Sequence, residues 1–285
     1  MSGAWLALLG VKGGPAIRPG SNMPTCSLLR LAGKTMLIDA GLGAARAVCD
    51  EGVPLTGIDL IVVTHLHSDH YLELGPLLHT AWTAGLTRPV PVIGPAGLRE
   101  YWDAFLASMA FDIDLRIADE GRVPLSPLAD LSVIAPGTIH DDGALRIEAI
   151  RNHHPPIEDS FALRVTGAGR SVVLSGDTAP FDGGEAFCAG ADLLLHEAML
   201  EAGVDAVIAN LKHADPRLRD HILRSHTAAE EVGRLANAAG VKALALNHFV
   251  PDGMPGFEED DWTRAVRTAW SGPLHIGRDG MRIDL

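Results

Sequence analysis

The feature of this sequence that most constrains its fold and function is a run of four potential metal ligands within six residues, His65–His70 (HLHSDH). The run follows Asp59–Thr64, an apolar stretch typical of a buried strand. In an extended chain its first two histidines point to the same side, whereas the aspartate and the last histidine enter the helix expected next. Three imidazoles and a carboxylate crowded at one turn cannot all find hydrogen-bond partners without a cation. The run therefore predicts a metal site at a strand-to-helix turn.

Further candidate ligands each follow an apolar strand in the second half of the chain. They are the adjacent pair His153 and His154, Asp177 after a glycine, and His248. Only one of the two adjacent histidines can point into a site from an extended segment. Each candidate alone is typical of a hydrogen-bonded structural residue, but with the first run they complete two coordination shells. We expect one ion to be held by His65, His67 and His154, the other by Asp69, His70 and His248, and Asp177 to bridge them.

Two such shells predict hydrolytic chemistry with two divalent metal ions. Three protein ligands and an open position are typical of catalytic Zn²⁺, although histidine and carboxylate ligands also suit Mn²⁺ or Fe²⁺. Two ions close together can share a hydroxide, activate it at neutral pH and stabilise the entering and leaving oxygens.

The rest of the chain alternates short strands with helices, which indicates an α/β fold of two sheets with helices outside them. No linker divides the chain, so we expect a single domain over residues 1–285. The expected strands are Trp5–Gly10, Ser27–Leu31, Thr35–Ile38, Leu60–Thr64, Val90–Ile93, Leu145–Ile150, Ala162–Thr166, Ser171–Leu174, Asp192–Leu195 and Ala243–Leu246. The expected helices are Asp69–Ala84, Ala96–Met109 and Thr227–Ala239, the last of them capped by Ser225 or Thr227.

Composition narrows the possible partners and the compartment. The 285 residues are 47% apolar and carry a net charge of −13, so the chain is globular, and a broad nucleic-acid surface is not expected. Three cysteines without metal-type spacing fit a reducing compartment, and Ala4–Leu9 is too short for a membrane anchor or a signal peptide. We expect a cytoplasmic protein with no membrane partner.

Two segments near the expected site are less clear from sequence. Residues 200–225 fit either a solvated surface element or a flap over the site. The segment Val250–Phe257 is rich in Gly and Pro and begins just after His248, so we expect it to line the pocket. The remaining histidines, expected to be surface or structural residues, are His79, His140, His213, His221 and His275.

Several blocks of the sequence resemble the metallo-β-lactamase superfamily. Five of them run over most of the chain in the order of that superfamily: Leu37–Gly41, His65–His70, His154, Ser175–Thr178 and His248. Four others resemble its ribonuclease Z and arylsulfatase-like branch: Leu9–Pro15, Gly94-Pro95, His196-Glu197-Ala198 and Ser225–Glu230.

The resemblance implies an αββα sandwich of two mixed β-sheets flanked by helices, a dinuclear site at one edge, and often a homodimer. It implies that Asp39 orients the ligand cluster from behind and that the ligand directly before the proline is His154. It also implies that His226 contacts the oxyanion of the substrate or protonates the leaving group, while Glu197 hydrogen-bonds its other ring nitrogen. Alternatively His226 only caps its helix. Asp69, His226 and Glu197 are thus the candidate catalytic residues.

The resemblance leaves several ester hydrolyses open. We expect a dinuclear hydrolase of a small-molecule ester, with a phosphodiester or an aryl-sulfate-type substrate leading and a lactone or carboxylic ester as the alternative. Cleavage of tRNA 3′ ends is less favoured, because in that family a tRNA-grasping arm separates the positions matching His154 and Asp177. Here they are 23 positions apart, with a tight Gly167–Gly169 turn between them. The remaining alternative, a metal-binding protein without catalytic activity, would need an incomplete coordination shell, and both expected shells are complete.

Overall fold

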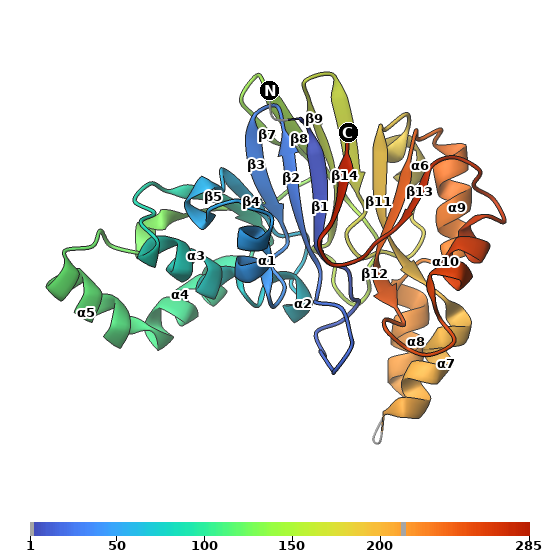
Figure 1. Ribbon diagram of the computed structural model, residues 1–285, viewed down its shortest axis with the longest axis horizontal. Coiled ribbons are helices and arrows are strands. Elements are labelled where there is room, and N and C mark those ends of the chain that lie inside the picture. The colour runs from blue at the N-terminus through green and yellow to red at the C-terminus, as the bar shows by residue number, and fades with distance from the viewer. Residues whose placement is uncertain (1–2, 212–214) are drawn as a thin grey trace.

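Two β-sheets face each other in the centre of the computed structural model, with helices on both outer sides (Figure 1). The structure describes residues 3–211 and 215–285. His213, expected to be a surface or structural residue, lies outside the described residues. So does Lys212, within the segment interpreted as a surface element or a flap.

The first sheet is built mainly from the N-terminal half of the chain. Its strand order is β14-β1-β2-β3-β4-β5-β6, antiparallel from β14 to β3 and parallel from β3 to β6. Its strands are β1 Trp5–Gly10, β2 Cys26–Leu31, β3 Lys34–Ile38, β4 Leu60–Val62, β5 Val90–Gly94, β6 Ala129–Val133 and β14 Met281–Asp284.

The second sheet has the order β13-β12-β11-β10-β9-β8-β7 and is likewise mixed, parallel from β10 to β13 and antiparallel from β10 to β7. Its strands are β7 Gly137–Asp141, β8 Leu145–Arg151, β9 Phe161–Gly167, β10 Arg170–Leu174, β11 Leu193–Met199, β12 Leu244–Val250 and β13 Leu274–Ile276. The expected sandwich of two mixed sheets flanked by helices is therefore confirmed.

The helices divide between the two outer sides in chain order (Figure 1). On the side of the first sheet lie α1 Ala44–Asp50, α2 Ser68–Tyr71, α3 Leu74–Thr83, α4 Leu98–Ser108 and α5 Ala110–Glu120. On the side of the second sheet lie α6 Gly184–Cys188, α7 Glu201–Asn210, α8 Pro216–Ser225, α9 Ala229–Ala238 and α10 Glu259–Val266. No helix within residues 3–211 and 215–285 has the length and apolar character needed to cross a membrane.

Strand β1 shows how alternation builds the two cores. Leu6 and Leu8 pack with residues of both sheets, in the layer between them. Trp5, Ala7 and Leu9 point the opposite way and pack with buried residues of α1 and α3. Since successive side chains of a strand point to opposite faces, a strand buried on both faces reads as one continuous apolar run.

The helix expected over Asp69–Ala84 is wrong, because the structure divides it into α2 and α3. At the break, the backbone of His70 and Glu73 is hydrogen-bonded to Ala40, with the oxygen of His70 accepting from Ala40 at 2.6 Å. The Glu73 carboxylate accepts from the backbone amides of Gly43 and Ala45 at the start of α1. The chain between α2 and α3 is thus anchored to the β3–α1 connection.

The prediction that Ser225 or Thr227 caps the helix expected over Thr227–Ala239 is also wrong. Helix α9 begins after Ala228, without a side-chain cap. The hydroxyl of Thr227 donates to the backbone oxygen of Thr178 at 2.5 Å, and that of Ser225 donates to Pro155 at 2.6 Å. Both hydroxyls therefore hold distant loops together instead of starting the helix.

Substitution of Gly176 tests whether the backbone before Asp177, the candidate bridging ligand, requires a glycine. Its φ is +58°, and a Cβ there would lie 2.6 Å from the backbone oxygen of Phe161. Gly169 has a φ of +74° with no atom within 4 Å of an added Cβ, so it is a matched control. We expect Gly169→Ala to cost about 1 kcal/mol and Gly176→Ala at least about 2 kcal/mol in urea unfolding. Equal losses would contradict the role given to the close approach of Phe161.

Candidate metal centre

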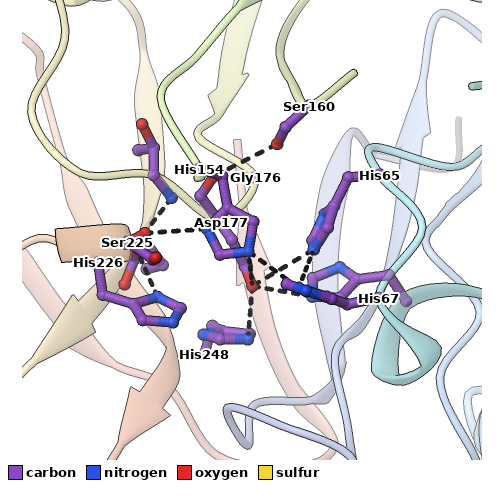
Figure 2. A network of polar contacts seen from close by, with 12 residues as sticks. His65, His67, His154, Ser160, Gly176, Asp177, Ser225, His226 and His248 are labelled. Carbon is purple, nitrogen blue, oxygen red and sulfur yellow. Dashed lines mark hydrogen bonds and ion pairs between the residues drawn. The ribbon is translucent and has the colours of Figure 1, made fainter. Parts of the chain in front are cut away.

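The candidate ligands meet at one edge of the two sheets because each lies near the carboxyl end of a strand. His65 and His67 follow β4, Asp177 follows β10, and His248 lies within β12. Asp69 and His70 lie on the short helix α2, and His154 on the loop between β8 and β9. Figure 2 shows His65, His67, His154 and His248 gathered around Asp177.

The first cluster consists of three imidazole nitrogens and one carboxylate oxygen. His67 Nδ1 lies 3.2 Å from His65 Nε2 and 2.9 Å from His154 Nε2. Asp177 Oδ2 lies 3.7 Å from His65 Nε2 and 3.9 Å from His154 Nε2. Ligand atoms around a tetrahedral Zn²⁺ at its usual bond lengths are about 3.3 Å apart. The observed separations bracket that value.

The second cluster is richer in carboxylate and uses the same Asp177 oxygen. Asp177 Oδ2 lies 2.9 Å from His248 Nε2 and 3.2 Å from His70 Nε2. Asp69 Oδ2 lies 3.3 Å from His248 Nε2 and 3.6 Å from His70 Nε2. One carboxylate oxygen therefore belongs to both clusters, which is the arrangement expected of a bridging ligand.

Hydrogen bonds behind the rings leave the inward nitrogens free to bind a metal. His70 Nδ1 donates to Asp39 Oδ2 at 2.8 Å, and His154 Nδ1 donates to the backbone oxygen of Ser225 at 2.9 Å. Asp39 also accepts from the Thr64 amide at 2.8 Å and has a φ of +62°, an unusual conformation for aspartate. A partner on the outer nitrogen fixes the tautomer and direction of a ligand histidine. The position of Asp39 thus agrees with its expected orienting role.

The electrostatic surroundings differ between the two clusters. Burial lowers the pKa of His65, and lowers that of His154 to about 4, so both rings are neutral at pH 7. Burial also opposes the charged form of His248, but Asp177 and Asp69 raise its pKa to about 10. The carboxylates thus attract positive charge to the second cluster.

The donor sets of both clusters fit metal ions. Two imidazole nitrogens 2.9 Å apart, as in His67 and His154, need a proton or a cation between them. The outer nitrogen of His154 already donates to a backbone oxygen, which leaves its inward nitrogen with a lone pair. Nitrogen and carboxylate ligands in sets of four suit Zn²⁺ and related divalent ions. The two clusters can therefore hold two divalent ions.

His226 lies beside the clusters and belongs to neither ion's four-ligand set. Its Nδ1 donates to Glu197 Oε1 at 3.1 Å, and its ring stacks on His248 with centroids 5.3 Å apart. The same Glu197 oxygen accepts from the backbone amides of Thr178 and Thr227. His226 therefore does not cap α9, and its other nitrogen, Nε2, is free of this contact.

One of the two adjacent histidines stays outside the site, as the resemblance implied, whereas His221 lines the pocket against expectation. The side chain of His153 is exposed, so the structure brings His154 into the cluster and leaves its neighbour outside. His221, expected to be a surface or structural residue, lines the pocket over the metal centre, with its ring centroid 6.1 Å from that of His67. It lies on α8, in the segment that sequence left open between surface and flap. The only sequence signal for it was an i, i+4 spacing to Ser225 on a helix.

A loop between β1 and β2 also forms part of the site. The Gly14 amide donates to Asp69 Oδ2 at 2.9 Å. A Cβ on Gly13 would lie 2.7 Å from a methyl group of Val250 and 3.1 Å from Cε1 of His248. Only a residue without a side chain lets this loop approach the ligands so closely. The motif Leu9–Pro15 resembled the family, but its place beside the ligands could not be read from its sequence.

The centre lies at the floor of a pocket of about 370 Å³. From the segment Val250–Phe257, expected to line the pocket, Val250, Pro251 and Asp252 do so. Helices α7 and α8, with the adjoining Leu211, contribute one wall, so for residues 200–211 and 215–225 the flap interpretation is the one that agrees with their position. The wall residues are Val207, Leu211, Leu218, His221 and Ile222.

The fold and the paired clusters define a metallo-β-lactamase-fold, metal-dependent hydrolase. The family model described as Anti-Pycsar protein Apyc1 matches residues 6–248, and the chain belongs to that family. The resemblance inferred from sequence motifs is thereby confirmed.

Similar proteins cover the whole chain. Ribonuclease Z of Mycobacterium bovis (strain BCG / Pasteur 1173P2) is 32% identical over 283 residues, 98% of each chain. The metallo-beta-lactamase fold protein YhfI from Bacillus subtilis has a TM-score of 0.72 at 21% identity, covering 99% of this chain and 100% of that one. Human tRNase Z, short form, has a TM-score of 0.69 at 22% identity, covering 98% of each chain. At these identities the two structures share the fold.

Metal content tests the assignment of two clusters. Saturation with Zn²⁺ followed by elemental analysis should yield two ions per chain. Asp177→Ala should lower the affinity for both ions, because its oxygen belongs to both clusters. Asp69→Ala should instead lower the affinity of the second cluster more than that of the first. The matched control is His153→Ala, which should retain both ions while His154→Ala does not. A single tightly held ion that Asp177→Ala leaves unchanged would contradict the dinuclear assignment.

Proposed function

We propose that this chain hydrolyses a small phosphodiester at a centre of two Zn²⁺ ions. The observation that carries the proposal is the pair of ligand clusters sharing Asp177 Oδ2 at the floor of a pocket of about 370 Å³. Such a volume lies within the range of small-molecule sites. Bound divalent ions supply Lewis acidity toward ester oxygens and a water nucleophile at neutral pH.

The residues of the chain provide orientation and proton transfer. Asp39 and the backbone oxygen of Ser225 hold the rings of His70 and His154 with their ligating nitrogens inward. Glu197 holds Nδ1 of His226 and so directs Nε2 of that ring away from itself. In the proposal, Nε2 of His226 donates a proton to the leaving oxygen of the ester.

The composition of the pocket wall favours an ester substrate that carries an apolar or flat group. Apart from His221, the residues that α7, the adjoining Leu211 and α8 present to the pocket are aliphatic: Val207, Leu211, Leu218 and Ile222. Aliphatic side chains bind apolar surface and offer no partner to charged groups. An aryl sulfate would fit the same wall. A lactone or a carboxylic ester is the alternative substrate class, since the same nucleophile attacks an acyl carbon.

Cleavage of tRNA 3′ ends is the second candidate, favoured by the name ribonuclease Z of the M. bovis relative. Two observations weigh against it. The segment between His154 and Asp177 contains β9 and β10, joined by the two residues Ala168 and Gly169, with six residues before β9 and two after β10, so it carries no projecting arm. The net charge of −13 also opposes binding of a polyanion.

Assembly into a homodimer stays a prediction, which sedimentation of the purified protein would test.

A panel of substrates tests the proposed class. On the Zn²⁺-loaded protein we expect bis(4-nitrophenyl) phosphate to be hydrolysed faster than 4-nitrophenyl sulfate or an aromatic lactone. Its kcat/KM should change little between 50 and 200 mM salt, because a small substrate does not present the many phosphates of a nucleic-acid backbone. Efficient processing of a precursor tRNA at physiological salt would instead favour the second candidate. Preferred hydrolysis of the lactone would move the protein to the alternative class.

His226→Ala separates a catalytic residue from a ligand. The variant should keep both ions and the fold but lose about 10²- to 10⁴-fold in kcat, with a smaller change in KM. A substrate with a very good leaving group should lose less, because it needs little protonation. Glu197→Gln should show a weaker defect, since its amide oxygen still accepts from the backbone. Loss of metal would make His226 a ligand, and full activity would leave it without a catalytic role.

A further inference from the structure

Two cations of the loop between β1 and β2 line the pocket beside the metal centre, and the proposed mechanism does not use them. They are Lys12 and Arg18. Lys12 is buried, with 4% of its surface exposed, whereas Arg18 is exposed. A buried ammonium is unusual in a pocket wall, because removing its charge from water is costly unless an anion compensates it.

The protein itself compensates Lys12 only in part. Its Nζ donates to the backbone oxygens of Gly13 at 2.6 Å and Gly14 at 3.0 Å, which occupies two of the three ammonium donors. Within residues 3–211 and 215–285, no carboxylate oxygen forms an ion pair within 4 Å of the Lys12 ammonium or the Arg18 guanidinium. Burial lowers the pKa of Lys12, and the nearby carboxylates of Asp252 and Asp69 offset only part of this effect.

The nearby acids are engaged elsewhere. Both carboxylate oxygens of Asp252 accept from Asn22, at 2.5 and 3.1 Å. Arg18 donates to the backbone oxygen of Asp252 and not to its carboxylate. Asp69 faces His248 and His70 in the second cluster. Neither cation therefore has a carboxylate in direct contact, although the charge of Asp252 still acts on Lys12 at longer range.

The loop places this charge next to the reacting centre. Gly14 accepts from Lys12 through its oxygen and donates through its amide to Asp69 Oδ2 at 2.9 Å. The ammonium is thus linked through one residue to an expected metal ligand. The pocket has positive charge on this side and an aliphatic wall from α7 and α8 on another.

We propose that Lys12 and Arg18 form an anion subsite that binds a negatively charged group of the substrate, so that the enzyme selects anionic esters over neutral ones. The proposal rests on the proposed ester hydrolysis in the same pocket and narrows its substrate class to phosphodiesters or sulfates. Lys12 provides its third N–H donor and a buried charge, and Arg18 adds charge at the exposed rim.

Two substrates with the same 4-nitrophenolate leaving group test the subsite on Zn²⁺-loaded protein: anionic bis(4-nitrophenyl) phosphate and neutral 4-nitrophenyl acetate. Lys12→Met keeps an apolar stem of similar length and removes the charge. We expect its kcat/KM for the anionic substrate to fall about 10- to 100-fold, mainly through KM, the effect expected for loss of a hydrogen bond to a charged group. The neutral substrate should change less than about threefold.

Three further measurements keep the test decisive. Arg18→Gln removes an exposed side chain, so it should fold normally and show a smaller loss of the same anion-selective kind. Lys34→Met, at a surface lysine paired with Asp142, is the matched control and should leave both substrates unchanged. Elemental analysis should find two ions in every variant. Equal losses on the anionic and neutral substrates would assign Lys12 to loop structure and overturn the proposal.

Binding of inorganic phosphate separates failure of the subsite from failure of the proposed function. If the wild-type protein hydrolyses no ester, calorimetric titration of the Zn²⁺-loaded protein with phosphate still reports on the two cations. Weaker phosphate binding in Lys12→Met and Arg18→Gln than in Lys34→Met would support the subsite. Unchanged phosphate binding in both variants would overturn it, whatever the enzyme hydrolyses.

Discussion

The carboxylate of Asp177 is the point on which the arrangement of the site depends. Its Oδ2 approaches nitrogens that come from α2, from β12 and from the loops after β4 and β8, so it joins elements of both sheets. Without cations, such convergence of lone pairs and negative charge is unfavourable. Metal binding would therefore contribute to the stability of the sheet edge as well as to catalysis, as it does where ligands come from separate elements.

Hydrogen bonds outside the two clusters hold the segments of that edge together. Ser225 is bonded through its backbone to His154 and through its hydroxyl to Pro155, which ties the end of α8 to a candidate ligand. Glu197 joins the segments that carry Thr178 and His226 through one carboxylate oxygen. The pocket wall and the pair of His226 and Glu197 are thus positioned by the same contacts that orient the rings. A change in one of these residues would affect both binding and chemistry.

Much of the fold was predictable because burial leaves a direct record in the chain. Trp5–Gly10 was assigned with the bounds that β1 has, since a strand buried on both faces is one apolar run. The break between α2 and α3 was not predictable, because it depends on bonds from Ala40 and from the start of α1, about 30 residues earlier. The extents of β11 and β12 were underestimated because they continue through polar residues of the site, Glu197 and His248.

The sequence by itself determined which chemistry this protein can support, because ligand identity and strand-end spacing are local properties of His65–His70, Asp177 and His248. Tertiary structure decided which atoms meet: one oxygen of Asp177 serves both clusters, and His154 enters while His153 stays outside. It also placed Lys12 and His221 in the pocket. Local patterns do not encode distances between segments that are far apart in the chain, and these are fixed only when the two sheets pack and their edges align.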